Sequence, residues 1–252
     1  MVSRDVAARY RGSVLGVFWS LFTPLLMLGV YTFVFGTVFR ARGWAAEGEH
    51  LGTAAFALIL FSGLIPFTLF SEVIGKAPRL IVSNRNYVKK VVFPIEILPV
   101  VGMGAALVQM AVSFGVLIVF LLVSNGGLPW TALLLPVVLA PFAILTLGFC
   151  WILASLGVYL RDLSQILPPV LSGTMFLSAI FYPLSSLPDK AQLVLLFGNP
   201  LVFPIEQVRE VLIYGLMPNW AGLALYTVVA VLLAWAGYAF FQKTRKGFAD
   251  VL

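Results

Sequence analysis

The most constraining feature of this sequence is a run of 64 residues, from Ile97 to Leu160, that holds no Asp, Glu, Lys, Arg or His. Four more long charge-free runs flank it, at residues 12–39, 51–71, 163–188 and 211–242. About 20 apolar residues suffice for a helix to cross a bilayer, and a charge at its centre costs about 2.5–3.5 kcal/mol on insertion scales. Backbone groups in lipid must pair internally, and nothing here alternates as the strands of a barrel do. The sequence therefore predicts an all-α, polytopic integral membrane protein.

The composition leaves no room for a soluble catalytic domain. Charged residues make up 10% of the 252 residues, whereas soluble domains carry about 25%. We therefore expect a single transmembrane domain over residues 1–252. Cys150 is the only cysteine and His50 the only histidine, so neither a disulfide framework nor a metal cluster is expected. We expect a buried structural thiol, an ordinary surface histidine and no cofactor bound by this chain.

Six membrane spans fit into the charge-free runs. The longest run has to hold two of them, separated by a turn at Asn125–Pro129, which reads NGGLP. The predicted spans are about 17–39, 53–74, 98–123, 131–160, 166–182 and 221–241.

The positive residues predict the orientation of these spans. Of the 16 Lys and Arg residues, 12 fall on one side of the membrane and 4 on the other. The four are Arg40, Arg42, Lys190 and Arg209. Because positive residues mark the cytoplasmic side, we expect both termini to be cytoplasmic. The net charge of +6 then reflects membrane topology, and no nucleic acid partner is expected.

The segment 187–214, before the last span, is apolar but interrupted. Asn199 and Pro200 cut it into pieces of roughly ten residues, each about 15 Å long as a helix, which is half of what a span needs. Three charged residues follow the break: Glu206, Arg209 and Glu210. So near to hydrocarbon, these charges must face water or one another. We therefore predict a re-entrant helical hairpin in which these five residues form a periplasmic gate. The alternative is an amphipathic helix or a plain loop on the outer surface.

The chain has no phosphate-binding loop of its own. Gly75-Lys76 is followed by Ala77-Pro78 instead of Ser or Thr, and no Gly stands five residues before Gly75. Ion coupling is poorly supported as well, because the spans hold few ionisable residues. A pump built on this chain therefore needs a separate ATPase that docks from the cytoplasm.

The inner loop at 76–94 is the only cytoplasmic loop large enough for that docking. Pro78 can open a helix there, and apolar residues recur at helical spacing beside basic ones. The predicted docking residues are Arg79, Leu80, Asn84, Tyr87 and Lys89. A basic amphipathic helix lying on anionic lipid is the alternative.

The first residues predict an amphipathic helix at the inner interface. Its apolar residues are each four apart and so share one helix face: Val2, Val6, Tyr10 and Val14. Arg4 and Arg11 point elsewhere.

Several short motifs, taken together, resemble those of a known family. In order they are Arg4-Asp5, RYRGSVLG at 9–16, Trp19-Ser20-Leu21, KKVVFP at 89–94, RDL at 161–163, FYP at 181–183, Asn199-Pro200 and Tyr214-Gly215. This set resembles the permease subunits of type-two ATP-binding-cassette exporters, which move lipid-linked O-antigen or wall teichoic acid across the bacterial inner membrane. The resemblance covers essentially the whole chain.

The resemblance implies a homodimer of six-span permeases paired with two nucleotide-binding subunits, which carry the ATP and Mg²⁺. It implies a coupling helix at about Arg79–Lys90 and re-entrant helices between the fifth and sixth spans. Relatives usually carry several more residues before the Arg-Asp pair, so either the interface helix of this chain is short or the start of the sequence is trimmed.

The implied cargo is a polyprenyl-pyrophosphate-linked glycan carried between membrane lipid and water. Glycans stack on aromatic rings, so rings of the first and fifth spans are candidates for lining its path: Trp19, Phe22, Tyr31, Phe35 and Tyr182. Basic residues at the inner interface are candidates for holding the pyrophosphate: Arg4, Arg9 and Arg11. The alternatives are rings that face lipid and arginines that only set topology. A drug or small-lipid exporter of the same architecture is the main rival function, and a membrane enzyme of glycan assembly is a more distant one.

Overall fold

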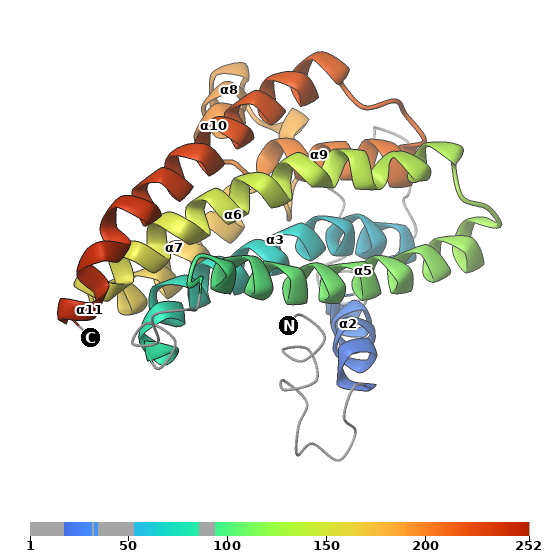
Figure 1. Ribbon diagram of the computed structural model, residues 1–252. Helices are drawn as coiled ribbons and strands as arrows, with labels where there is room; N and C mark the ends of the chain where they lie inside the picture. The colour runs from blue at the N-terminus through green and yellow to red at the C-terminus, as the bar shows by residue number, and fades with distance from the viewer. Residues whose placement is uncertain (1–17, 32, 35–52, 86–93, 252) are drawn as a thin grey trace.

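The computed structural model describes residues 18–31, 33–34, 53–85 and 94–251, which form helices and turns with no strand among them. Four long helices run side by side through the molecule (Figure 1). They are α3 (Thr53–Ser83), α5 (Ile97–Asn125), α6 (Leu135–Tyr159, preceded by a 3-10 turn, Trp130–Leu134) and α10 (Trp220–Thr244). Each of the four is long and apolar enough to cross a membrane. The chain is therefore a multi-pass membrane protein.

The remaining described helices are short. They are α2 (Phe18–Tyr31), α7 (Leu163–Leu177), a 3-10 turn (Leu184–Ser186), α8 (Asp189–Gly198), α9 (Val202–Arg209) with the π turn Glu210–Tyr214, a 3-10 turn (Arg245–Gly247) and α11 (Phe248–Val251). In Figure 1, α2 leaves the bundle at a steep angle to α3 and α5, whereas α9 lies against α3 and α6.

The helix α3 forms the centre of the bundle, with α5 on one side and α6 on the other. In the most apolar part of α3, 83% of the residues are buried, whereas in that of α10 only 17% are, so α10 lies at the surface of the described bundle. The rings of Phe70 and Phe142 stack at 6.4 Å across the contact between α3 and α6. With 31 residues, α3 is about 46 Å long and exceeds the roughly 30 Å hydrocarbon core. Its end at Ser83 therefore extends beyond the membrane interior.

Two glycines of α6 allow neighbouring helices to approach closely. A Cβ at Gly148 would lie 2.8 Å from the Cα of Ala234 on α10, and a Cβ at Gly157 would lie 2.1 Å from the carbonyl oxygen of Pro78 on α3. In lipid, such backbone approach replaces the hydrophobic effect as the source of packing energy between helices. These two contacts fix α6 between α3 and α10.

The boundary expected between the second span and the docking helix is absent. The membrane boundary predicted near residue 74 falls inside α3 and stays a prediction. The sequence also predicted that a separate helix starts at Pro78, whereas α3 continues through both Pro66 and Pro78 to Ser83. That prediction is wrong, because a proline in a membrane helix is tolerated when neighbouring helices pack around the disturbed turn. Here Gly157 leaves space for the backbone of Pro78.

The fifth expected span is also shorter than the sequence indicated. The helix α7 ends at Leu177, and Ala179 has a left-handed backbone with a φ of 53°, so the helix cannot continue to Tyr182. The described residues hold four candidate spans, or five if the bent pair α8 and α9 counts as one. The count of six spans stays a prediction, and the predicted N-terminal interface helix lies outside the described residues.

Candidate functional site

The outer hairpin is broken where the sequence places the break. The helices α8 and α9 meet at 105° around Asn199 and Pro200. The Asn199 amide donates to the hydroxyl of Ser178 at 2.9 Å and accepts from the Leu201 N–H at 3.0 Å. The Tyr226 hydroxyl donates to the Pro200 carbonyl at 2.8 Å. The polar groups of the break are thus bonded to the end of α7 and to α10.

Arg209 is the most deeply buried charged residue of the described chain, with 0% of its surface exposed. Its Nη1 donates to the Ala179 carbonyl at 2.8 Å and to the Glu206 carboxylate at 2.9 Å, and its Nη2 donates to the Ile180 carbonyl at 2.9 Å. A Cβ at Gly63 on α3 would lie 3.0 Å from Nη2. Arg209 therefore ties α9 to the turn after α7, and a glycine of α3 makes room for it.

The two glutamates of α9 and its π turn have different partners. Glu206 pairs with Arg209, which agrees with the expectation that these charges face one another or water. Glu210 instead accepts from the Gln207 amide at 2.7 Å, and the Gln207 carbonyl accepts from the Asn219 N–H at 2.6 Å. Both glutamates remain partly exposed, whereas Arg209 points into the protein. Arg209 thus acts as an internal tie, and the lining of an exit by the two glutamates stays a prediction.

Sequence reasoning missed four residues of this outer cluster: Ser178, Ala179, Gln207 and Tyr226. The amide of Gln207 inside an apolar segment was a usable signal, because a polar group in such a segment needs a partner. The backbone turn at Ala179 carries no sequence signal, since alanine is not typical of a left-handed conformation.

Of the predicted docking residues that the structure describes, Arg79 and Leu80 lie near the end of α3, and Asn84 follows its last residue, Ser83. Arg79 donates to the Ser164 hydroxyl of α7 at 3.3 Å. The Asn84 amide donates back to the Leu80 carbonyl at 2.9 Å and so ends the helix. Tyr87 and Lys89 lie outside the described residues.

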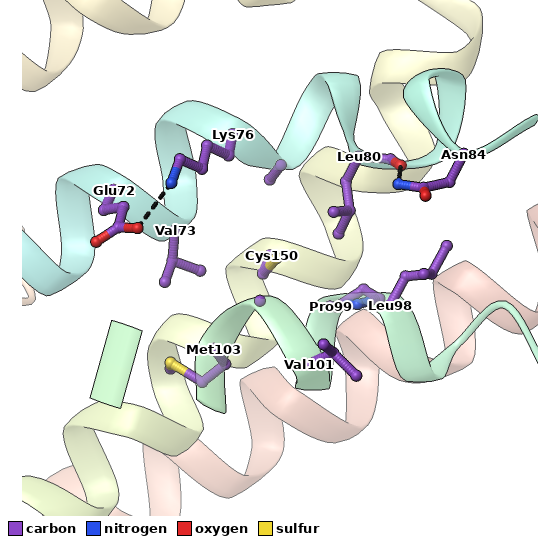
Figure 2. A pocket seen from close by; sticks show the side chains of 12 residues that line it. Glu72, Val73, Lys76, Leu80, Asn84, Leu98, Pro99, Val101, Met103 and Cys150 are labelled. Carbon is purple, nitrogen blue, oxygen red and sulfur yellow. Dashed lines mark hydrogen bonds and ion pairs between the residues drawn. The ribbon is translucent and has the colours of Figure 1, made fainter. Parts of the chain in front are cut away.

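Two cavities open beside this end of α3. One of about 240 Å³ lies between α3, α5 and α6, and Figure 2 shows Leu80 and Cys150 on its wall. The Lys76 ammonium, 2.7 Å from the Glu72 carboxylate, lies along the same wall (Figure 2). The other cavity, of about 440 Å³, lies between α3 and α7 and is lined by Arg79, Leu80 and Ser164. The inner end of α3 therefore offers recesses on two sides, and Leu80 lines both.

A third groove, of about 350 Å³, lies between α2, α3 and α5 within the membrane. Its polar wall consists of Thr23, Thr68, Glu72, Gln109 and Ser113. Polar side chains at membrane depth are typical of a path for a polar solute.

The aromatic rings proposed for the cargo path lie elsewhere. Trp19 and Phe22 are 38% and 45% exposed and contact each other edge to face at 5.3 Å, and neither lines the groove. Tyr31 ends α2, and Tyr182 lies half-buried after α7. Phe35, Arg4, Arg9 and Arg11 lie outside the described residues. The described residues include no cluster of His, Cys, Asp and Glu that could hold a metal ion.

Comparison with known proteins gives consistent matches over the whole chain. A family model described as ABC-2 type transporter matches residues 1–213. The chain is 30% identical, over 99% of its length and 93% of the relative's, to the O-antigen export system permease protein RfbA of Myxococcus xanthus. It is 26% identical to the protein of that name from Klebsiella pneumoniae, over 100% and 93% of the two lengths. It is 25% identical to the polysialic acid transport protein KpsM of Escherichia coli, over 96% and 91%.

Proposed function

The chain belongs to the ABC-2 type transporter family, and on that premise we propose that it is the transmembrane subunit of an ATP-driven polysaccharide exporter. The observation that carries this function is the agreement between relatives named for different cargoes, O-antigen and polysialic acid, which are both polysaccharides. The similarity extends over nearly the whole of each protein. The chain is a transport component of the inner membrane.

Membership in this family implies a partner subunit that binds ATP, since the sequence lacks a phosphate-binding loop. We propose that this partner docks at the inner end of α3, at Arg79, Leu80 and Asn84 together with Tyr87 and Lys89 of the following segment. The recesses on both sides of Leu80 support this placement, because they can receive side chains of a docked partner.

We propose that both termini are cytoplasmic. Most of the described cations outside the outer hairpin gather at the bundle end where α3 and α10 end and α5 and α7 begin (Figure 1). They are Arg79, Arg85, Arg161, Lys243, Arg245 and Lys246. Positive residues favour the cytoplasmic side, so this end of the bundle is the inner one.

For the cargo, we propose a lipid-linked glycan that moves along a path shared by two copies of this chain. Two observations support a partner or water, and not lipid, beside α7. Ser172 and Gly173 are exposed on α7, and α7 is too short at 15 residues to face a full bilayer alone. The hydroxyl and amide groups in the groove between α2, α3 and α5 suit a polyhydroxylated solute.

Deletion and complementation in the native host test this function. Cells without the chain are expected to lose surface polysaccharide and to accumulate it inside, and the wild-type chain restores export. Restoration also requires an active ATP-binding subunit. Unchanged surface polysaccharide combined with altered resistance to apolar drugs would instead identify a drug exporter of the same architecture.

A further inference from the structure

The C-terminal end of the chain folds back onto the inner end of the bundle. After α10 ends at Thr244, the turn Arg245–Gly247 leads into α11, whose Phe248 is 0% exposed. The Phe248 ring contacts Phe241 nearly edge to face at 5.6 Å and Tyr159 at 6.0 Å. The last residues are therefore docked onto the protein.

Phe248 belongs to a small buried cluster that is separate from the main core. Its members are Ile81, Ile95, Ala154, Val158, Phe241 and Phe248. Ile81 lies in the last turn of α3, and Ile95 lies just before α5. Ile81 precedes the segment that connects α3 with α5, and Ile95 follows it. Phe248 therefore packs into the cluster that contains both flanks of this part of the inner loop.

Polar contacts also join the C-terminal turn to the start of α5 and to α6. The Arg245 guanidinium pairs with the Glu96 carboxylate at 3.0 Å, across 149 positions of sequence. The Glu96 carbonyl accepts from the indole of Trp151 at 3.2 Å, and the Tyr159 hydroxyl donates to the Thr244 carbonyl at 3.0 Å. Glu96 is thus fixed through its side chain by the tail and through its backbone by α6.

We propose that residues Arg245–Val251 form a C-terminal clasp, which positions the inner loop so that the ATP-binding subunit meets it in one arrangement. The proposal rests on the proposed function, because it requires a partner that docks at this loop. A loop whose ends are fixed loses less conformational freedom when a partner binds, and pre-organisation of this kind raises affinity. Arg245 and Phe248 are thereby positioning residues, which act on docking through Glu96, Ile81 and Ile95.

The clasp differs from a basic tail that only attracts anionic lipid. A lipid-binding tail depends on the number of its charges, so Lys246 would contribute as much as Arg245. Arg245 and Lys246 are both exposed in the same turn, but in the clasp Arg245 acts through one carboxylate, that of Glu96.

The test titrates the purified cognate ATP-binding subunit onto the permease in nanodiscs and follows the stimulated rate of ATP hydrolysis. Arg245→Ala and Glu96→Arg are expected to raise the half-saturating concentration of the subunit by about fivefold, while the maximal rate is kept. The exchanged pair, Glu96→Arg with Arg245→Glu, is expected to return to within about twofold of the wild type. Lys246→Ala, the matched control, is expected to leave the titration unchanged. Phe248→Ala is expected to shift it in the same direction, and Phe248→Leu less so.

The outcomes separate the clasp from the function on which it rests. A photo-crosslinking residue at Asn84 is expected to capture the subunit in the wild-type permease. If the wild-type permease captures the subunit but Arg245→Ala and Phe248→Ala both keep the wild-type half-saturating concentration, the clasp is overturned. The docking proposal then remains intact. Equal shifts for Arg245→Ala and Lys246→Ala would replace the clasp with a general charge effect. Failure of the wild type to capture or stimulate the subunit would overturn both proposals.

Discussion

Arg209 and Glu206 form an ion pair of 2.9 Å in which the arginine is completely buried and the glutamate is partly exposed. The same guanidinium donates to the carbonyls of Ala179 and Ile180, so one side chain satisfies three acceptors from two segments. The pair therefore connects the outer hairpin with the end of α7, and its loss should destabilise both segments.

Replacing Arg209 by Leu is expected to destabilise the permease by about 3–5 kcal/mol, because a buried pair is broken and two carbonyls lose their donors. Arg209→Lys is expected to recover only part of this, since an ammonium lacks the planar fork that reaches Ala179 and Ile180 together. Unfolding of the purified protein in detergent measures both effects. Arg85→Leu, at an exposed arginine two residues after α3, is the control and should change little. Wild-type stability of Arg209→Leu would show that the tie is dispensable.

The hydroxyl of Tyr226 is expected to stabilise the break between α8 and α9. Tyr226→Phe leaves the Pro200 carbonyl without its donor, at a cost of about 1–3 kcal/mol, with a matching loss of export. Tyr238→Phe removes a hydroxyl from an exposed position of the same helix and should cost less than about 0.5 kcal/mol. Unfolding and surface polysaccharide are measured for both variants. Equal behaviour of the two would show that the hydrogen bond from Tyr226 to Pro200 does not stabilise the break.

Gly157→Ala is expected to disturb the contact between α3 and α6, because the new methyl group would meet the Pro78 carbonyl at 2.1 Å. Overpacking of this kind costs about 1–3 kcal/mol. Gly102→Ala is a matched control, since nothing lies within 4 Å of its added Cβ, and alanine favours the helix. Thermal stability in detergent distinguishes them. A Gly157→Ala protein as stable as Gly102→Ala would mean that the helices separate without cost.

Leu80→Asp is expected to abolish stimulation of the ATP-binding subunit, while membrane insertion persists. Leu80 lines both inner recesses, so a carboxylate there opposes insertion of an apolar partner side chain. Val82→Asp places the same charge on the same turn but lines neither recess. ATP hydrolysis by the reconstituted complex is the measurement. Normal stimulation of Leu80→Asp would favour the reading in which this segment only lies on lipid.

Labelling with a membrane-impermeant thiol reagent tests the orientation, in a background of Cys150→Ser. Cysteines at Gly126 and Asp189 are expected to react from outside intact cells, whereas cysteines at Asn84 and Lys246 should react only after lysis. Gly126 follows the end of α5, Asp189 begins α8, and both are exposed. Reaction of Asn84 from outside would reverse the topology and remove the docking proposal.

The sequence predicted the features that composition and local pattern control. Long charge-free runs became long helices, and the turn at residues 125–129 became a helix end in which Gly126 has a φ of 70°. The break at Asn199 was also readable, because an Asn-Pro pair flanked by glycine interrupts any helix.

Features that depend on contacts between distant segments could not be read in this way. The local rule for Pro78 indicates a helix start, and only its contact with Gly157 explains why α3 continues. From the sequence alone, Arg209 is interpreted as one charge of an amphipathic helix face. Its burial depends on the carbonyls of Ala179 and Ile180, about 30 residues earlier, and on the space at Gly63. The pairing of Arg245 with Glu96 had no sequence signal at all, because it joins residues 149 positions apart in the sequence.

The continuity of α3 has a mechanical consequence. Gly63 of this helix adjoins Arg209 of the outer hairpin, and Ile81 of the same helix lies in the cluster that holds the inner loop. The continuous helix between these two residues is about 27 Å long and moves as one rigid element. A tilt imposed at one end therefore displaces the other at the same moment, so the contact at Arg209 and the cluster around Ile81 are mechanically coupled through one helix.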